Sequence, residues 1–334
     1  MPGDTFSFDG LNDALKAAGE DTRLRILALL AEAELTVSDL TDILHQSQPR
    51  ISRHLKLLAE AGLIERYREG TWAFFRAAES GRGGLLIRTL ISQLDPKDRV
   101  IARDRERLVA VRASRAAAAQ SYFRKHAAEW DRIRKLHVSD AAVERAIKDA
   151  LDERPFRSLL DLGTGTGRML EMFGPQIERG LGIDLSLDML LLARDRLERA
   201  ALRNCSVRQG DIYDLPIADN SFDAVIIHQV LHFLDDGGRA VKEAARVLRP
   251  GGSLLVVDFA PHEIEYLREK HAHRRLGFAT ETVSQWIDAA GLEGVMHKSL
   301  PPEPGSGGKI AVSLWLARDN RALIAAKPAK RGVA

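Results

Sequence analysis

The sequence predicts two domains of different class: a small, mainly α-helical domain at the N-terminus and a larger α/β domain behind it. Three observations support this prediction. Helical apolar spacing over residues 11–58 is followed by two short extended runs. From about residue 141, buried apolar runs alternate with helical stretches, as in a parallel sheet that is covered on both faces. The length of 334 residues is sufficient for two separate cores.

The helices of the first domain have recognisable ends. Asp21 is placed to cap one helix and Thr36 the next, with Asp39 at the third helical position as in a capping box. Ser47 precedes a further helix, whose inward apolar stripe stops at Gly62, a typical helix end. These signals predict a series of short helices.

Two extended runs, residues 63–68 and 71–76, follow and meet at Glu69-Gly70, which is typical of a tight turn. Helix, turn, helix and two-stranded wing, in this order, predict a winged helix-turn-helix. Residues 1–46 hold nine acidic and three basic side chains, whereas residues 47–88 hold eight basic and four acidic ones. The net positive charge of residues 47–88 suits binding to phosphate groups. An ordinary solvated surface also explains this charge when it is considered alone.

A helix end rich in arginine, serine and glutamine fits the major groove of DNA, where arginine pairs with guanine and glutamine with adenine. Arginines of the wing suit the phosphate backbone. Each of these arginines alone is equally explained as a solvated surface charge. Only the combination of these side chains with the order helix, turn, helix and wing favours DNA binding. The predicted DNA-binding residues are Ser47, Gln48, Arg50, Ser52, Arg53, His54, Lys56, Arg66 and Arg68.

Residues 11–94 resemble the ArsR/SmtB family of dimeric bacterial repressors, above all from Leu35 through Arg53-His54-Leu55-Lys56 to Arg76. The resemblance implies a transcription regulator that binds a two-fold, double-stranded DNA operator as a homodimer. Residues 47–56 correspond to the recognition helix of that family.

The chain departs from the metal-sensing members of that family. Thiol-type sensors have cysteines in the third helix, where this chain has Thr36 and Ser38, and the helix expected at 83–94 contains no histidine. His271 and His273 lie in a run with arginine and lysine, so we expect them to be solvated. We therefore expect no metal site.

Composition excludes several other classes. No apolar run reaches the roughly 18 residues of a membrane helix, and the first residues have neither the basic nor the apolar region of a signal peptide. The single cysteine, Cys205, excludes an internal disulfide and a thiolate metal site. We expect a cytoplasmic protein with no membrane partner.

The expected domain boundaries are 1–95 for DNA binding, 96–135 for a helical linker, 136–318 for the α/β domain and 319–334 for a disordered basic tail. The linker has high helix propensity and mixed charge. An exposed linker helix and a dimerisation arm explain it equally well.

Seven candidate strands lie in the second domain, and ligands of such sheets bind beyond the carboxyl ends of the strands. The strands are expected at 158–162, 181–184, 206–209, 223–228, 253–258, 294–299 and 310–317.

The first strand runs directly into a loop with Gly163, Gly165 and Gly167, where the backbone can turn tightly and approach a nucleotide-like ligand. Its G-x-G-x-G spacing differs from the G-x-G-x-x-G of dinucleotide sites, and Asp161 at the strand end would repel a pyrophosphate. S-adenosylmethionine tolerates that carboxylate because it carries an ammonium and a sulfonium.

Two further strand ends carry carboxylates. Asp184, seventeen residues after Gly167, is placed to accept hydrogen bonds from ribose hydroxyls. Asp211 is placed to accept from an adenine amino group, and Ile212 to pack on the adenine ring. The loop and the two acidic positions together form a much stronger signal than the loop alone.

These motifs, spread over about residues 120–317, resemble the class I S-adenosylmethionine-dependent methyltransferases that act on small molecules. The resemblance implies a Rossmann-like, seven-stranded sheet with an antiparallel last strand, and S-adenosylmethionine, or S-adenosylhomocysteine as an effector. It makes Tyr122 and Trp130 candidates for a lid over the cofactor. The cofactor-binding residues it implies are Asp161, Gly163, Gly165, Gly167, Asp184, Leu185, Asp211, Ile212 and His228.

Two histidines lie at and just after the end of the fourth strand, where a methyl acceptor is expected. His228 and His232 are candidate catalytic bases, and each also fits a packing role. Asp258, at the end of the fifth strand, has the same standing. The single cysteine argues against arsenite methylation, which requires several thiols.

Three functions are compatible with the sequence. The first is a regulator that also methylates a small molecule, and the second is a non-catalytic repressor whose methyltransferase-like domain senses S-adenosylmethionine or S-adenosylhomocysteine. The third, a methyltransferase whose helical domain only dimerises, is weakened by the outward Arg50, Arg53 and Lys56. An open acceptor site would favour the enzyme, and a plugged one the sensor.

Overall fold

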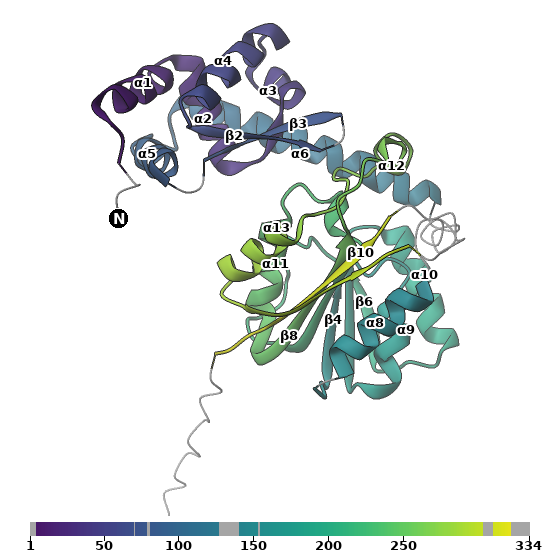
Figure 1. Ribbon diagram of the computed structural model, residues 1–334. Coiled ribbons are helices and arrows are strands. Elements are labelled where there is room, and N and C mark those ends of the chain that lie inside the picture. The colour runs from purple at the N-terminus through teal and green to yellow at the C-terminus, as the bar shows by residue number, and fades with distance from the viewer. Residues whose placement is uncertain are drawn as a thin grey trace, which may run out of the picture. The chain divides into compact units, whose positions relative to one another are not determined.

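The computed structural model describes residues 5–69, 71–78, 81–126, 140–152, 154–302 and 310–321. The chain forms two compact units (Figure 1). The N-terminal unit comprises the residues up to Ala119 together with Glu263–Arg274, and the C-terminal unit comprises Gln120–His262 and the residues from Arg275 on. The expected tail after residue 321, the lid candidate Trp130 and the turn residue Gly70 lie outside the described residues.

The N-terminal unit has the predicted order of elements. Helices precede a helix-turn-helix pair, and an antiparallel hairpin follows it, with the strands in the order β1-β3-β2. This arrangement confirms the winged helix-turn-helix. The elements are α1 (Phe8–Ala18), α2 (Asp21–Glu32), β1 (Leu35–Thr36), α3 (Val37–Leu44), α4 (Gln48–Glu60), β2 (Ile64–Glu69), β3 (Trp72–Ala77), α5 (Gly81–Ser92) and α6 (Arg99–His126).

Local hydrogen bonds determine where these helices begin. The Thr36 side chain accepts from the backbone N–H of Asp39, whose carboxylate accepts from the N–H of Thr36, so the predicted capping box is confirmed. The cap of α2 was predicted one residue too late: Glu20 accepts from the N–H of Arg23, and Asp21 is already helical. Ser47 is at the N-cap of α4 but makes no capping bond through its side chain.

The helix α6 occupies most of the region that was expected to be a linker, and its first part packs on the N-terminal unit. Buried Asp104 pairs with Arg25 of α2, with Nε and Oδ2 2.6 Å apart, and Leu108 belongs to the core of the unit. Arg115 pairs with Asp39 of the capping box. The interpretation as a freely exposed linker helix is therefore wrong for this part of α6.

The C-terminal unit contains the expected seven-stranded sheet. Its strand order is β6-β5-β4-β7-β8-β10-β9, and β10 runs antiparallel to both of its neighbours, as the resemblance implied. The strands are β4 (Ser158–Leu162), β5 (Arg179–Asp184), β6 (Cys205–Gln209), β7 (Phe222–His228), β8 (Leu248–Phe259), β9 (Glu293–Leu300) and β10 (Val312–Arg318). The helices are α8 (Asp140–Asp152), α9 (Arg168–Phe173), α10 (Leu187–Arg199), α11 (Gly237–Val247) and α13 (Thr280–Ala289).

Helices cover both faces of this sheet. The helices α8, α9 and α10 lie on one face, and α11 and α13 lie on the other (Figure 1). Leu160, Val225 and Val256 of the central strands pack with the apolar residues of α11 and α13. Because both faces are covered, the central strands are nearly continuous apolar runs, which explains why the sequence signal was clear. The carboxyl ends of β4, β5, β7 and β8 meet at one edge.

The segment Glu263–Arg274, between β8 and α13, was expected to belong to the α/β domain, but it is part of the N-terminal unit. It contains α12 (Glu265–His271), which packs on the wing. The Oε1 atom of Glu265 accepts from the backbone N–H of Thr71 at 2.7 Å, and the Arg268 guanidinium lies 4.8 Å from the centroid of the Trp72 ring.

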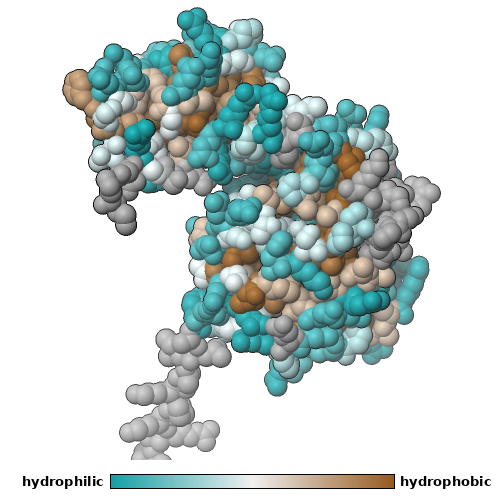
Figure 2. All heavy atoms as spheres, in the orientation of Figure 1, coloured by the Kyte–Doolittle hydropathy of each residue, from teal (hydrophilic) through white to brown (hydrophobic). Residues whose placement is uncertain are grey.

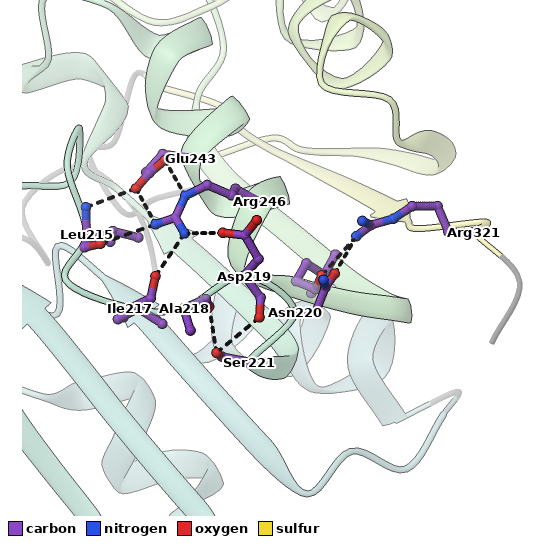
Figure 3. A network of polar contacts seen from close by, with 10 residues as sticks. Leu215, Ile217, Ala218, Asp219, Asn220, Ser221, Glu243, Arg246 and Arg321 are labelled. Atoms are coloured by element: carbon purple, nitrogen blue, oxygen red, sulfur yellow. Dashed lines mark hydrogen bonds and ion pairs between the residues drawn. The ribbon is translucent and has the colours of Figure 1, made fainter. Parts of the chain in front are cut away.

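A network of polar contacts fixes the loop between β6 and β7 (Figure 3). Arg246 of α11 donates to Glu243 and Asp219 and to the carbonyl oxygens of Leu215 and Ile217, at 2.6–3.2 Å. This loop follows Asp211 directly, so the network anchors the chain behind one of the predicted cofactor residues.

The face of the molecule in Figure 2 is mostly hydrophilic, and apolar residues show through in small groups. Large apolar side chains that are exposed include Phe8, Val109 and Leu191. No helix in the described part of the chain is long and apolar enough to cross a membrane.

We expect Arg246→Ala to lower the free energy of unfolding of the C-terminal unit by roughly 1–3 kcal/mol, because two loop carbonyls and Glu243 lose their donor. Arg246 also holds the pKa of Glu243 below its usual value, so this stabilisation is present at neutral pH and is lost as the pH falls through that lowered pKa. Urea denaturation at several pH values measures both effects.

The control is Arg199→Ala, which removes an exposed pair with Asp195 on α10. We expect a change below about 0.5 kcal/mol there. Equal losses in the two variants would contradict the role given to the network.

Candidate functional site

The glycine loop at the end of β4 has the backbone that the sequence predicts. Gly163, Gly165 and Gly167 all have positive φ angles, of 71°, 52° and 80°. The N–H groups of Gly163 and Thr164 donate to the carbonyl oxygen of Ile183 at the end of β5. A Cβ atom on Gly163 would lie 2.1 Å from Cγ2 of Val230, so no other residue fits there.

Asp161 is buried where β4 enters this loop. Its Oδ2 atom accepts a hydrogen bond of 2.6 Å from the Thr164 hydroxyl. The loop therefore folds over the carboxylate, and Asp161 provides negative charge directly beneath the glycines. An ammonium or sulfonium group suits this environment better than a phosphate.

Asp184 joins the ends of β4 and β5. Its Oδ2 atom accepts from the N–H of Gly165 at 2.8 Å, and its Oδ1 atom accepts from the N–H of Ser186 at 2.9 Å. Burial raises the pKa of this carboxyl group, and the two N–H donors partly offset the rise. Each carboxylate oxygen has a second lone pair, so the group can still accept from ligand hydroxyls.

The remaining candidates for the cofactor lie on the neighbouring loops. Asp211 is exposed and accepts from the N–H of Tyr213 at 2.9 Å. Ile212 is partly buried against the core, and Leu185 is exposed beside Asp184. A buried carboxylate under a glycine-rich loop, a second carboxylate at the next strand end and an apolar surface beside an exposed Asp211 fit S-adenosylmethionine.

The two histidines have different surroundings. His228 is half-buried at the end of β7, opposite Val257 of β8. His232 is 2% exposed, and its Nδ1 atom lies 2.7 Å from Oδ1 of Asp258. The structure thus pairs two residues that the sequence analysis considered separately.

The lid candidates are only partly described. Tyr122 is half-buried in α6 and lies edge-on to Phe123, whose ring contacts Phe233 with the centroids 4.8 Å apart. The aromatic residue that α6 brings to the segment around His232 is therefore Phe123, which the sequence analysis did not select. Its apolar spacing in the helix was the available signal.

The recognition helix α4 presents most of the predicted DNA-binding residues. Ser47, Gln48, Arg50, Ser52, Arg53 and Lys56 are exposed, as are Arg66 and Arg68 of the wing. His54 is the exception. It is 9% exposed, and its Nδ1 atom lies 3.5 Å from Oε2 of Glu20, the N-cap of α2. His54 therefore packs inside the unit and is not suited to contact a base.

The structure also corrects the expectation for the histidine run. His273 is buried rather than solvated, and His271 is half-buried against the ring of Tyr266. Cys205 packs near Gly174 and Gly180, where burial raises the pKa of its thiol. Among the residues that the structure describes, no group of three or more histidine, cysteine or acidic side chains could hold a metal ion.

Two family models match the chain. The model of the bacterial regulatory proteins of the arsR family matches residues 20–66, and a methyltransferase domain model matches residues 160–256. A solved methyltransferase of Haloferax volcanii, in complex with the Trm112 activator, has a similar fold, with a TM-score of 0.50 and 23% identity. That match covers 61% of this chain and 98% of the other.

Several curated proteins are similar to part of this chain. The demethylmenaquinone methyltransferase of Thermobifida fusca is 30% identical over 174 residues, which cover 50% of this chain and 72% of that enzyme. An uncharacterized 37.1 kDa protein in transposon TN4556 of Streptomyces fradiae is 37% identical over 151 residues, or 41% of this chain and 43% of that protein. The methyltransferase YcgJ of Bacillus subtilis is 31% identical over 41% of this chain and 54% of its own length. The chain thus spans about half the length of these last two relatives.

We expect Asp184→Ala to raise the Kd for S-adenosylmethionine about 5- to 150-fold, equivalent to roughly 1–3 kcal/mol, because ribose hydroxyls would lose their acceptor. The conservative Asp184→Asn variant preserves the size of the side chain and should also weaken binding. Because the pKa of Asp184 is raised, the affinity of the unaltered protein should fall in mild acid. Titration calorimetry measures these constants. Asp195→Ala on α10 is the control, and an equal effect there would refute the placement.

Replacement of Arg50, Arg53 and Lys56 together by alanine should weaken binding to random-sequence duplex DNA. Three lost phosphate contacts should reduce the slope of log K against log salt by about 2–3. Fluorescence anisotropy over a series of KCl concentrations measures this slope. The control replaces Arg194, Arg199 and Arg203, which are exposed on the C-terminal unit. Unchanged DNA affinity in the first variant would favour a helical domain that only dimerises.

The sheet order, the glycine loop with its two strand-end carboxylates and the match to the Thermobifida fusca enzyme all agree. Through its C-terminal unit the chain belongs to the S-adenosylmethionine-dependent methyltransferases, and it carries an ArsR-family helix-turn-helix domain at its N-terminus.

Proposed function

We propose that this protein is a transcription regulator that binds an operator in cytoplasmic DNA and also methylates a small molecule. The observation that carries the proposal is the presence, in one chain, of an exposed basic recognition helix and a complete set of candidate cofactor residues. Arg50 and Arg53 represent the first, and Asp161 and Asp184 the second.

The chain's own residues would bind and align the reactants. S-adenosylmethionine, when bound, supplies a methyl group that is already activated by its sulfonium. Asp161 lies where it can balance positive charge, and Gly163 allows the loop to pack directly against Val230. Asp184 would fix the ribose, so that the methyl group faces one direction only. Alignment of this kind accounts for much of the rate that an enzyme adds to a displacement.

A small-molecule acceptor agrees with the names of the relatives. One of them is a demethylmenaquinone methyltransferase, and another is an ubiquinone/menaquinone biosynthesis C-methyltransferase of Vibrio cholerae, 36% identical over 36% of this chain. Both names refer to small molecules rather than to protein or nucleic acid.

A homodimer is part of the proposal because of the apolar residues exposed on the first helix. Phe8 of α1 is 86% exposed, and Leu11 and Leu15 lie one and two turns further along the same helix and are also exposed. Leu85 of α5 is exposed too. A second copy of the chain would remove these side chains from water, and a two-fold operator would then bind two recognition helices.

The packing of α12 on the wing favours a second candidate function, ligand sensing. The segment that carries α12 belongs by sequence to the methyltransferase region but packs in the DNA-binding unit, through Glu265 on Thr71 and Arg268 on Trp72. A ligand that changes the conformation of this segment would change the wing. It would alter DNA affinity only by the difference in its own affinity for the two conformations.

Calorimetry with S-adenosylmethionine and with S-adenosylhomocysteine, each with and without operator DNA, tests the proposal. The expected result is binding of both compounds, together with formation of S-adenosylhomocysteine when a small-molecule fraction of host cells is added. Binding that changes DNA affinity without any turnover would favour the sensor. Absence of binding of either compound would contradict both functions.

A further inference from the structure

The tip of the wing binds an anionic side chain from a distant part of the sequence. The backbone N–H of Thr71 donates to Oε1 of Glu265 at 2.7 Å, although the two residues are 194 positions apart. Both belong to the N-terminal unit. Thr71 lies beyond the last pair of the β2–β3 ladder, Glu69 with Trp72. Its N–H therefore donates to an acceptor outside the hairpin.

The carboxylate of Glu265 is held in place from two sides. Besides Thr71, its partner is Arg268 of the same helix, whose Nη1 atom lies 2.9 Å from Oε2. Arg268 also lies 4.8 Å from the centroid of the Trp72 ring. Burial raises the pKa of Glu265, but the N–H of Thr71 and the guanidinium of Arg268 more than offset this, so that its pKa is below the usual value. Glu265 is thus a carboxylate at neutral pH.

The surface around the tip suits the backbone of DNA. Arg66 and Arg68 are exposed and lie two residues apart, on the same face of β2. Trp72 is 43% exposed. Backbone N–H groups are common donors to DNA phosphates. A phosphodiester, like a carboxylate, is an anion that accepts charge-assisted hydrogen bonds through its oxygens. Glu265 therefore offers Thr71 the same kind of acceptor as a DNA phosphate.

The segment that carries Glu265 is closed at its base. The N–H of His262, just before the segment, donates to the carbonyl oxygen of Leu276, just after it, at 2.9 Å. The N–H of Phe278 donates to the carbonyl oxygen of Phe259, also at 2.9 Å. These bonds do not involve the wing. Residues 263–274 can therefore leave the wing while the base of the segment stays intact.

We propose that the amide of Thr71 is a binding site for a phosphate of the DNA backbone, and that Glu265 occupies this site in the protein without DNA. The inference rests on the DNA binding of the proposed function. A phosphate and a carboxylate repel each other, so the N–H of Thr71 holds one of them at a time. The helix α12 is then an intramolecular competitor of DNA at the wing.

This competition gives a direction to the coupling between α12 and DNA. A segment that only supports the wing would raise DNA affinity, whereas a competitor lowers it. A ligand that favours α12 on the wing would weaken DNA binding, and one that favours its release would strengthen it. Either effect is limited by the difference in the affinity of that ligand for the two conformations.

The first test removes the carboxylate. We expect Glu265→Ala to lower the Kd for random-sequence duplex DNA about 3- to 15-fold, because a hydrogen bond to a charged group no longer has to be broken. Fluorescence anisotropy measures the Kd. Glu269→Ala is the matched control, since Glu269 is an exposed residue of the same helix and its loss changes the charge equally. The control should change the Kd less than about 2-fold, since an exposed charge is screened.

The second test separates competition from charge. Arg268→Gln removes a positive charge, which by itself weakens binding to DNA. Because Arg268 holds both Glu265 and Trp72, we expect this variant to bind the duplex more tightly than the unaltered protein. Lys270→Gln, at an exposed position of α12, removes the same charge and should bind no more tightly. A variant that fails to fold cannot imitate a gain in affinity.

Hydrogen exchange of residues 263–274 in the unaltered protein reports displacement of α12 directly. We expect faster exchange there when the duplex is added. Unchanged or slower exchange would overturn the inference, and so would a Glu265→Ala variant that binds DNA no more tightly than Glu269→Ala. These results would leave the proposed function intact. If neither the unaltered protein nor Glu265→Ala binds DNA, the proposed regulator function fails, and the inference fails with it.

Discussion

The candidate cofactor site is held together by the carboxylate of Asp184. It accepts one hydrogen bond from Gly165 and one from Ser186, and so ties the loop after β4 to the loop after β5. The glycine loop has few side chains of its own to define its shape, and its other contacts include two N–H groups on the carbonyl of Ile183 and the Thr164 hydroxyl on Asp161. Burial works against the ionised form of this carboxyl group. Ligand hydroxyls would add donors to the same oxygens, so that ligand and loop stabilise one another.

The same edge of the sheet brings together residues from distant parts of the sequence. Parallel neighbours place their carboxyl ends side by side, so β4, β5, β7 and β8 contribute Asp161, Asp184, His228 and Asp258 to one region. The side chains divide into two groups there. Asp161 accepts from the Thr164 hydroxyl and Asp184 from the Gly165 N–H, so both hold the glycine loop, whereas Asp258 holds a histidine. Three carboxylates in one fold therefore have distinct tasks, which are set by the donors that surround each of them.

Much of this could be predicted from the sequence because the signals are local. The capping box of Thr36 and Asp39 spans four residues, and the bounds of the apolar strands β4 and β7 were predicted to within one position, whereas β8 begins five residues earlier than predicted. The strong pattern of the glycine loop with Asp184 depends on spacing alone. Each of these features is fixed by neighbours in the chain, so no knowledge of tertiary packing was required.

Features that depend on packing were missed. The pairing of His232 with Asp258 follows from the register of β7 and β8, which the sequence does not reveal. For His54 a signal was present: it lies three residues after Ile51 and four before Leu58, on the inward face of α4, and its arginine neighbours obscured this. Nothing in the run around Arg268 indicates that it would contact Trp72 of the wing.

The packing of α12 has a consequence for how this protein can be taken apart. Glu263–Arg274 belong to the N-terminal unit, although residues of the C-terminal unit precede and follow them in the sequence. A single cut in the chain therefore cannot separate the two units. A fragment that ends near Ala119 would lack Arg268 against the indole of Trp72 and Glu265 against the amide of Thr71. The complementary fragment would contain α12 without the wing on which it packs. An exchange of the DNA-binding unit between homologues would succeed only if both stretches of chain were exchanged together. The two units are therefore not independent modules joined by a linker.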